Sequence, residues 1–469
     1  MPITLHDTHV VRHNATGWWL DEAGTVEAFA PLDGRIDADV VVIGGGYTGM
    51  WTAWHLLDAG ASVALLEGGV CGHGPSGRNG GFCESMWLSA PALRERFGDG
   101  PARALLDSSS DSVSFIGDWC RSEGVDAWFD QSGYMCVSTA PAFDDVGREA
   151  VAAAAALGAP ERVVELSGAE VRARCDSALF RRGVLIPDFA TLQPARLALG
   201  LRRRLVERGA RVFERSHVRA LRGTEAETAS GRVRAGAAVL AVGSAVRALR
   251  ELRGRLTVTS SHVVLTEPVP DVIERIGWTG GECITDGRTL LHYFRTTRDG
   301  RILLGWGGGR LAYGARLNGR VEVDPEIASQ THAALLRLFP DLAGRRIDHA
   351  WGGPIDVSPS HIPQIGTLPD APVHFAFGFT GNGVGPSQLA GRTLASLALD
   401  RRDDHTRLPI VDAGPGARVP PEPLTWLGGS LVRSALIRRE RVAEDGGEAD
   451  PLTRAICAAP RAMGMHLGR

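Results

Sequence analysis

A buried strand, a glycine-rich turn and a helix follow one another without interruption in residues 39–67, and few folds accommodate that order. Residues 39–43 (DVVVI) are a short apolar run, which is typical of a strand buried on both faces of a parallel sheet. Apolar side chains then recur at helical spacing over residues 47–59, and residues 62–66 (SVALL) form a second apolar run. The pattern predicts the first strand–helix–strand unit of a Rossmann-type sheet.

The turn between the first strand and the helix has the sequence GGGYTG, which matches the spacing G-x-G-x-x-G. In such a turn Gly44 allows the tight bend, Gly46 lets the backbone approach a pyrophosphate, and Gly49 lets the helix pack close to the strand. Tyr47 and Thr48 open the helix, where unpaired N–H groups and the positive end of the helix dipole attract phosphate. A glycine-rich turn without a ligand is the alternative, but the flanking strands and helix favour a dinucleotide site.

Glu67 directly follows the second apolar run. It lies close to the spacing of ~20 residues expected for the acid that accepts hydrogen bonds from the hydroxyl groups of a ribose. A carboxylate at this place repels a 2′-phosphate, which argues against NADP. The expected ligand is therefore a dinucleotide with an unphosphorylated ribose.

The loop after the second strand distinguishes a flavin site from a simple NAD site. An NAD-binding fold would continue directly to its next helix, whereas this chain inserts the sequence GGVCGHGPSGRNGGF. Within it, Ser76, Arg78, Asn79, Gly80 and Gly81 offer small side chains and hydrogen-bond donors, which suit a loop that lies against a flavin and its diphosphate. A plain glycine-rich surface loop is the alternative interpretation of these residues alone.

The dinucleotide unit followed by G-x-S-G-R-N-G-G resembles the D-amino acid oxidase, glycine oxidase and sarcosine oxidase superfamily of FAD enzymes. Residues 76–81 are most similar to the γ-glutamylputrescine oxidase branch, and the resemblance extends in scattered blocks over residues 18–398. It implies that FAD is the cofactor. It also implies that FAD is bound by Gly44, Gly46, Tyr47, Thr48, Gly49, Glu67, Ser76, Arg78, Asn79, Gly80 and Gly81.

Three later blocks support the same resemblance. Residues 210–221 look like the family's strand that clasps the adenine, with Val218 as the contact, and residues 237–244 look like a buried strand that ends in a glycine turn at Gly243. Residues 377–385 form another glycine turn before a helix, and a helix N-terminus suits the electron-rich edge of a reduced flavin. In the family this turn closes over the isoalloxazine ring, a role that the resemblance gives to Gly381, Asn382, Gly383 and Val384.

The remaining apolar segments predict an antiparallel sheet that is interleaved with the FAD-binding domain. Strands are expected at residues 132–138, 183–187, 257–266, 290–296 and 301–306, with an Asp-Gly hairpin turn between the last two. The expected fold class is α/β combined with α+β, in which a Rossmann-type FAD-binding domain carries an antiparallel-sheet substrate domain. We expect the FAD-binding domain at residues 36–95, 195–250 and 345–400, the substrate domain at 96–194 and 251–344, and a C-terminal extension with an amphipathic helix at 401–469.

The resemblance implies oxidation of a carbon–nitrogen bond, in which a small amine or amino acid gives hydride to flavin N5 and the imine is hydrolysed. This chemistry needs a well-aimed C–H bond rather than a catalytic acid–base pair. The candidate catalytic residues His292, Tyr293 and Arg295 lie along one expected strand, and Tyr293 and Arg295 share a face because alternate side chains point the same way. If Arg295 faces the flavin, its guanidinium suits a substrate carboxylate or phosphonate, and the alternative is a solvated residue of the sheet.

All 51 basic residues are arginine, because the sequence contains no lysine. A lysine Schiff base, a phosphate-binding Walker lysine and a lysine general base are therefore excluded. Sarcosine-oxidase-type enzymes place a lysine over the flavin to activate O2. The expected electron acceptor here is thus either O2, with Arg78, His292 or Arg295 as the cation, or another molecule.

Composition narrows the partners and the compartment. The net charge of −3 gives no reason to expect nucleic acid, and no apolar run reaches the ~20 residues of a membrane span. The seven cysteines contain no C-x-x-C pair, so neither a metal site nor a disulfide framework is expected, and the cytoplasm is the expected compartment. A covalent link between the flavin and Cys71 or Cys83 is conceivable but follows no recognisable pattern. Residues 424–441 predict the amphipathic helix, which is expected to pack on the protein rather than on a membrane.

Two other classes of flavoprotein stay open. An aromatic-hydroxylase-type FAD monooxygenase would need NAD(P)H and a late Gly-Asp flavin motif, and residues 378–385 contain no aspartate. A non-catalytic flavoprotein would use FAD as a structural core for binding a partner. Reduction of the flavin by NADPH would favour the monooxygenase, whereas reduction by an amine would favour the amine-oxidising enzyme.

Overall fold

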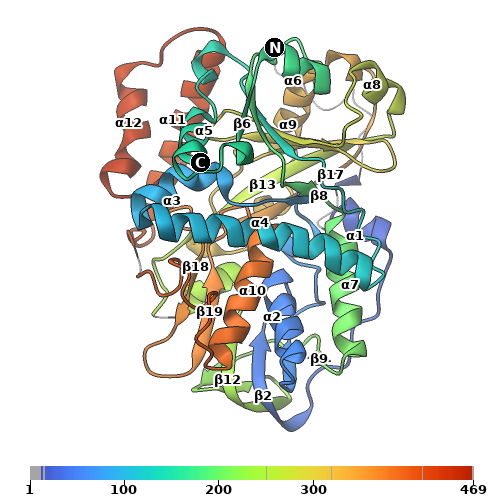
Figure 1. Cartoon of the computed structure of the whole chain (residues 1–469), viewed down its shortest axis with the longest axis vertical. Helices are drawn as coiled ribbons and strands as arrows, with labels where there is room; N and C mark the ends of the chain where they lie inside the picture. Colours follow the sequence, from blue (N-terminus) through green and yellow to red (C-terminus); the bar gives the residue numbers. More distant parts are fainter. Residues whose placement is uncertain (1–11, 14–15, 250, 318, 415, 467–469) are drawn as a thin grey trace.

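The strand of the glycine-rich unit lies inside a largely parallel sheet of eight described strands, in the lower half of Figure 1. The computed structural model describes residues 12–13, 16–249, 251–317, 319–414 and 416–466. Strand β2 (Gly34–Ile43) pairs in parallel with β3 (Val63–Leu66) on one side and with β12 (Gly231–Leu240) on the other. The last four residues of β2 are buried, as their apolar run predicts.

The parallel strands end level with one another, which gathers the loops that follow them at one edge of the sheet. Ile43 lies opposite both Leu66 and Leu240. Strand β19 (Val373–Phe377) pairs in parallel with β12, and the chain turns immediately afterwards at Gly378. Ligands of open α/β sheets bind at this carboxyl edge, so the glycine-rich turn, Glu67 and the late glycine turn all lie where a dinucleotide is expected.

Helices cover one face of this sheet. Helix α2 (Tyr47–Asp58) lies beside α10 (Val384–Ala398), and α4 (Asp99–Ser122) crosses above both of them (Figure 1). Two tryptophans of α2 meet Trp119 of α4 edge to face, with ring centroids 5.1 and 5.4 Å apart. Helix α7 (Pro194–Glu207) packs on the other side of α2. The predicted Rossmann-type unit is therefore confirmed.

A second sheet of nine described strands lies in the upper half of Figure 1, in the order β1-β17-β13-β16-β15-β14-β5-β7-β6. Its neighbours are antiparallel except for two parallel pairs, β1 with β17 and β5 with β14. The hairpin of β15 (His292–Thr296) and β16 (Ile302–Trp306) forms as predicted, around a turn in which Gly300 has a φ of 80°. Strand β17 (Ile347–Val357) pairs with β13 (Thr257–Thr266), so the expected domain boundary at residue 345 falls just before a strand of this second sheet.

The remaining described elements belong to these two sheets, connect them or cover them. The helices among them are α1 (Trp18–Ala23), α3 (Ala90–Phe97), α5 (Arg148–Ala156), α6 (Gly168–Arg174), α8 (Pro270–Arg275) and α9 (Pro325–Leu338). The strands are β1 (Arg12–His13), β4 (Phe82–Cys83), β5 (Tyr134–Val137), β6 (Val164–Leu166), β7 (Gly183–Ile186), β8 (Ala190–Thr191), β9 (Arg211–Phe213), β10 (Ala220–Arg222), β11 (Glu225–Glu227), β14 (Cys283–Asp286) and β18 (Gln364–Thr367). Strand β4 pairs with β8. This pairing ties the flavin-type loop, residues 68–82, to the segment that leads into α7.

The C-terminal extension forms two helices, α11 (Leu424–Glu444) and α12 (Pro451–Ala462), which pack on each other at the edge of the molecule (Figure 1). The expected apolar face of α11 is buried only in its second half, where Ala435 lies against the protein. Leu424, Leu427 and Leu431 are 62%, 54% and 55% exposed. The first half of the helix turns a neighbouring face toward the protein instead, because Thr425 is buried and a Cβ atom on Gly429 would lie 2.3 Å from the side chain of Leu311. Among the described residues, no helix is long and apolar enough to cross a membrane.

Candidate functional site

Two of the three glycines of the first turn lie where a side chain would clash with backbone, as their spacing predicts. A Cβ atom on Gly44, whose φ is 107°, would lie 2.3 Å from the carbonyl oxygen of Ala241. A Cβ atom on Gly49 would lie only 1.9 Å from the carbonyl oxygen of Gly44, so the helix can approach the strand only without a side chain there. Gly46 is different, because its Cβ position faces the hydroxyl of Ser76 at 3.0 Å. Gly46 directly precedes the start of α2, the end of a helix that favours an anion.

Ser76 joins the two motifs that the sequence separates by a strand. Its Oγ accepts a hydrogen bond from the backbone N–H of Tyr47, the first residue of α2, at 2.9 Å. The hydroxyl of Tyr47 in turn donates to the carbonyl oxygen of Pro194 at 2.7 Å, and burial raises the pKa of Tyr47. The N-terminus of α2, which carries a partial positive charge, is thus held against the flavin-type loop.

Glu67 lies over the glycine-rich turn at the carboxyl edge of the sheet. Its Oε2 accepts a hydrogen bond from the N–H of Gly45, and its Oε1 accepts one from the N–H of Gly69, both at 2.7 Å. The carboxylate therefore stands between the two glycine-rich loops, where a ribose-binding acid is expected.

Asn79 fastens the flavin-type loop internally. Its Nδ2 donates to the carbonyl oxygen of Ser76 at 2.8 Å, and its Oδ1 accepts from the N–H of Gly81 at 2.8 Å. Two tryptophans hold the same loop from outside. The indole N–H of Trp19 donates to the carbonyl oxygen of Asn79 at 2.9 Å, and that of Trp351 donates to the carbonyl oxygen of Arg78 at 2.8 Å. The loop is therefore a fixed surface rather than a plain solvent-exposed turn.

Arg295 reaches this loop from strand β15 and is buried, with 3% of its surface exposed. Its Nη1 donates to the carbonyl oxygens of Gly81 and Leu192, at 2.8 and 2.7 Å, and its Nε donates to the carbonyl oxygen of Thr296. Burial lowers the pKa of Arg295 to about 10, which leaves the guanidinium charged at neutral pH. The alternative of a solvated residue is wrong, because the side chain is buried, and its bonds go to the protein's own backbone.

Tyr293 lies on the same face of β15 as Arg295, as the alternation of the strand predicts. Its ring meets that of Phe82 edge to face at 5.8 Å, and a Cβ atom on Gly80 would lie 2.8 Å from it. Its hydroxyl is hydrogen-bonded to Oγ of Ser261 at 2.8 Å, and burial raises the pKa of Tyr293 to about 12. Tyr293 is thus a neutral phenol that borders the flavin-type loop.

His292, the third candidate on this strand, points to the opposite face. Its Nδ1 lies 2.6 Å from Oδ2 of Asp286, and its ring stacks on Trp306 with centroids 6.1 Å apart. Burial lowers the pKa of His292. The structure therefore brings Tyr293 and Arg295 together at the loop and leaves His292 on the far side of the sheet.

Arg295→Met tests whether this arginine fixes the loop or binds substrate. The carbonyl oxygen of Gly81 also accepts from the N–H of Leu192, but removal of the guanidinium takes a donor from the carbonyl oxygen of Leu192. We therefore expect the free energy of unfolding to fall by about 2 kcal/mol and FAD to bind more weakly. Denaturant titration and flavin content of the purified protein measure both effects. Arg298→Met, on the same hairpin but exposed and paired with Asp126, serves as the matched control. A rise in KM for acidic substrates with unchanged stability and flavin content would instead support a substrate anchor.

The late glycine turn comes close to the residues that follow the flavin-type loop. Helix α10 begins at Val384, two residues before the expected start, and Gly381 has a φ of 87°. A Cβ atom on Gly385 would lie 2.1 Å from the carbonyl oxygen of Glu84, just after β4. Asn382 and Gly381 are exposed at the edge of the turn. The N-terminus of α10 and that of α2 therefore open on the same edge of the sheet.

Two buried carboxylates of this region were not predicted from the sequence. Asp356 of β17 accepts a hydrogen bond from the N–H of Gly378 at 2.6 Å, and burial raises its pKa to about 6. Glu214 follows β9 and accepts hydrogen bonds from Arg202 and from the N–H of Cys71. Asp356 lies in a strand that also contains Asp348 and His349, so no distinct signal marks it in the sequence. Glu214 stood inside the block assigned to the adenine-binding strand.

That block differs from its expected form. Residues 210–221 do not form one strand, because β9 ends at Phe213, Arg215 has a φ of 50°, and β10 begins only at Ala220. Val218 lies in the intervening segment, half-buried against the apolar cluster on the second face of the eight-stranded sheet. Gly243 has a φ of 51° and opens a short 3-10 turn directly after β12, so the predicted glycine turn is present.

The thiols of this region are buried. All seven cysteines are free and buried, and burial raises the pKa of both Cys71 and Cys83. No group of three or more histidine, cysteine, aspartate or glutamate residues suited to a metal ion occurs in the described parts of the chain.

Comparison with known proteins agrees with this geometry. Residues 39–397 match the family described as FAD dependent oxidoreductase. The chain is 29% identical over 428 residues to the gamma-glutamylputrescine oxidoreductase of Escherichia coli (strain K12), covering 88% of this chain and 96% of that one. It is 27% identical over 392 residues to a glycine oxidase of Pseudomonas aeruginosa, covering 81% and 98%. Among solved structures, glycine oxidase from Geobacillus kaustophilus superposes with a TM-score of 0.65 at 21% identity, covering 78% of this chain and 96% of that one.

Proposed function

The chain belongs to the family of FAD-dependent oxidoreductases, and we propose that it oxidises a carbon–nitrogen bond of a small amine or amino acid. The observation that carries the proposal is the contact of the two sheets at the loop 76–81. There Tyr293 and Arg295 of the nine-stranded sheet meet residues that follow the dinucleotide unit of the other sheet. A flavin on this loop and a substrate under Tyr293 would be adjacent.

We propose that FAD lies along the carboxyl edge of the eight-stranded sheet. The start of α2, at Gly46 and Tyr47, would hold the diphosphate, because its N–H groups and helix dipole favour an anion. Glu67 would accept hydrogen bonds from the ribose hydroxyls, and Val218 and Gly243 would border the adenosine half. The flavin half would be held by Ser76, Arg78, Asn79, Gly80, Gly81, Gly381, Asn382, Gly383 and Val384.

When bound, FAD supplies the acceptor for the hydride that leaves the carbon bearing the nitrogen, and water then hydrolyses the imine. The residues of the chain position the substrate for this step. Tyr293 remains protonated at neutral pH, so its hydroxyl, which Ser261 fixes, donates or accepts a hydrogen bond but does not act as a base. Arg295 keeps Gly81 in place and thereby sets the floor of the substrate site.

The electron acceptor is O2 or another molecule, and the residues proposed for contact with the flavin include no lysine because the sequence has none. Arg78 lies in the loop and is paired with Glu322, whereas Arg295 reaches the loop from β15 and donates to the carbonyl oxygen of Gly81. We also propose a reducing compartment such as the cytoplasm, since seven free, buried cysteines suit it.

An anaerobic panel of amines tests the proposal through bleaching of the flavin absorbance. The panel holds γ-glutamyl amines, N-methyl amino acids, D-amino acids, glycine, aminophosphonates and secondary amines, and NADPH is tested alongside. We expect at least one amine, and not NADPH, to bleach the flavin. Tyr293→Phe is expected to slow that bleaching between about 10- and 100-fold at saturating amine. The reason is that a misplaced substrate no longer directs its C–H bond at the hydride acceptor.

Tyr313→Phe is the matched control, since Tyr313 is an exposed tyrosine away from the loop, and it should leave the rate unchanged. Bleaching by NADPH would point to a monooxygenase. Bleaching by no amine in the panel, with the flavin retained and reducible by dithionite, would count against amine oxidation.

A further inference from the structure

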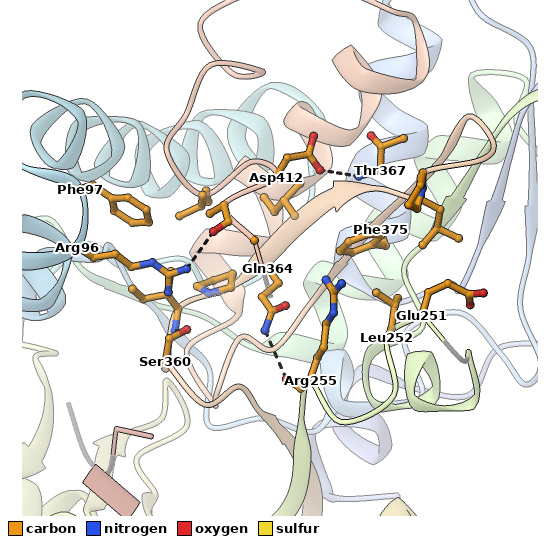
Figure 2. Close-up of a pocket in the computed structure, with 18 residues that line it drawn as sticks. Arg96, Phe97, Glu251, Leu252, Arg255, Ser360, Gln364, Thr367, Phe375 and Asp412 are labelled. Carbon is orange, nitrogen blue, oxygen red and sulfur yellow. Dashed lines mark hydrogen bonds between the residues drawn. The ribbon is translucent and has the colours of Figure 1, made fainter. Parts of the chain in front are cut away.

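A pocket of about 360 Å³ lies beside strand β18, away from the loops described above (Figure 2). Its walls come from the end of α3, from residues 251–255, from β18 and β19, and from residues 410–414. None of the residues proposed to bind FAD or substrate lines it. A pocket of this volume accommodates a small organic molecule.

Arg255 is the most unusual group in this pocket. Its side chain makes no hydrogen bond or ion pair within the described chain, and its Nε is buried without a partner. Burial lowers the pKa of Arg255, and the charge of Arg418 nearby lowers it further. A half-buried guanidinium whose charged neighbour has the same sign is a position that favours an anion.

The other polar groups of the pocket leave this charge uncompensated. Two acids also line the pocket, Glu251 and Asp412, and neither forms a described ion pair with Arg255. Asp412 accepts a hydrogen bond from the N–H of Thr367 at 2.9 Å. Arg96 and Arg255 lie on opposite sides of Gln364 in Figure 2. Arg96 donates a hydrogen bond to the carbonyl oxygen of Ala413 and has no ion-pair partner within the described chain. Both arginines therefore present positive charge to the same space.

Gln364 adds a second unsatisfied group. Its Nε2 donates to the backbone carbonyl oxygen of Arg255 at 3.4 Å, whereas its Oε1 is buried with no partner in the described chain. Apolar side chains complete the walls, among them Leu252, Ile362 and Phe375. The pocket thus combines a cationic end with an apolar body.

We propose that this pocket is a second ligand site, which binds a small organic carboxylate with an apolar body. The planar fork of Arg255 matches the two oxygens of a carboxylate, and the apolar walls bury the rest of the molecule. Phe375 belongs to the strand that leads into the late glycine turn, and Arg255 precedes the strand that carries Ser261. A ligand in the pocket therefore contacts β18 and β19 of the eight-stranded sheet and the segment that leads into β13 of the other sheet.

Calorimetric titration of the FAD-loaded protein with 4-bromobenzoate tests the proposal, with 4-bromobenzamide as the uncharged counterpart. We expect saturable binding of the carboxylate and binding of the amide weaker by about 10-fold or more, because the amide lacks the charge-assisted hydrogen bonds. Arg255→Gln should weaken carboxylate binding by about 10-fold or more. Arg253→Gln is the matched control, because Arg253 is exposed and does not line the pocket.

Crystals of the wild-type holoprotein soaked with 4-bromobenzoate give a readout that does not depend on any variant. Anomalous density of bromine in the pocket, with the carboxylate beside Arg255, supports the proposal. Bromine density only beside Tyr293, or nowhere, overturns it. Equal binding of acid and amide, or unchanged binding in a folded, FAD-loaded Arg255→Gln protein, overturns it as well.

Discussion

Gly49→Ala is expected to abolish FAD binding and to lower the free energy of unfolding by more than about 3 kcal/mol, which is at the upper end of the cost of overpacking. The new methyl group would lie 1.9 Å from the carbonyl oxygen of Gly44, so backbone would meet side chain with no flexible group to move aside. Relief would require α2 to move away from β2, which displaces the helix N-terminus that favours the diphosphate. Flavin absorbance of the purified protein and chemical denaturation measure the two effects.

Gly428→Ala is the matched control for this substitution. Gly428 lies on the exposed side of α11, and a Cβ atom there meets nothing within 4 Å. Alanine is the better helix former, so we expect a gain of about 0.5 to 1 kcal/mol and an unchanged content of flavin. A Gly49→Ala protein that keeps its flavin and its stability would contradict the tight contact between α2 and β2.

Glu214→Gln is expected to lower the free energy of unfolding by about 3 to 5 kcal/mol, the usual cost of breaking a buried ion pair. Oε1 of Glu214 accepts from Arg202 and from the N–H of Cys71, while Oε2 accepts from Arg202 and from the N–H of Phe29. A glutamine replaces one acceptor oxygen by a donor, which leaves Arg202 buried with half of its partner. Chemical denaturation at pH 7 measures the loss.

The pH dependence of stability gives an independent check on Glu214. Burial raises the pKa of this carboxyl group, but the hydrogen bonds from Arg202 and from the backbone outweigh burial, and the net pKa is lowered. A lowered pKa in the folded state means that the stabilisation is present above the pKa of the unfolded chain and is lost as pH falls through the folded value. Wild-type stability should therefore fall more steeply in acid than that of Glu214→Gln.

Asp37→Asn breaks the pair of Asp37 with Arg234, whose side chains are 67% and 72% exposed, and serves as the control. Solvent screens such a pair, so no measurable change in stability is expected. Equal effects of Glu214→Gln and Asp37→Asn would show that burial of the Glu214 pair contributes nothing.

Local patterns of the sequence predicted the features that depend on neighbours in the chain. The strand, turn and helix around Gly44, Gly46 and Gly49 need only the spacing of glycines and apolar residues. The structure has the end of the strand and both ends of the helix within a residue of the expectation, whereas the strand begins five residues earlier, at Gly34. The common face of Tyr293 and Arg295 followed from strand alternation for the same reason. FAD as the cofactor came from resemblance to a family, and the match over residues 39–397 confirms that family.

Features set by distant parts of the chain could not be predicted in this way. The partners of Arg295 are Gly81 and Leu192, which are 214 and 103 positions away. Strand alternation also places His292 on the other face of the strand. Only the structure shows that Asp286 is its hydrogen-bond partner there. Likewise, Glu214 directly after the end of β9 forms a buried ion pair with Arg202, a partner that the local pattern of residues 210–221 does not reveal.

The two tryptophans that hold the flavin-type loop have a consequence for biosynthesis. Trp19 comes from the first described helix, whereas Trp351 is 273 positions beyond the carbonyl oxygen that it grips, and α10 follows later still. A growing chain on the ribosome therefore makes the glycine-rich unit early but cannot fix the loop that we propose holds the flavin until most of its length has emerged. With FAD placed on this loop as we propose, we expect cofactor loading to be one of the last events of folding, and an incomplete chain to lack the full site.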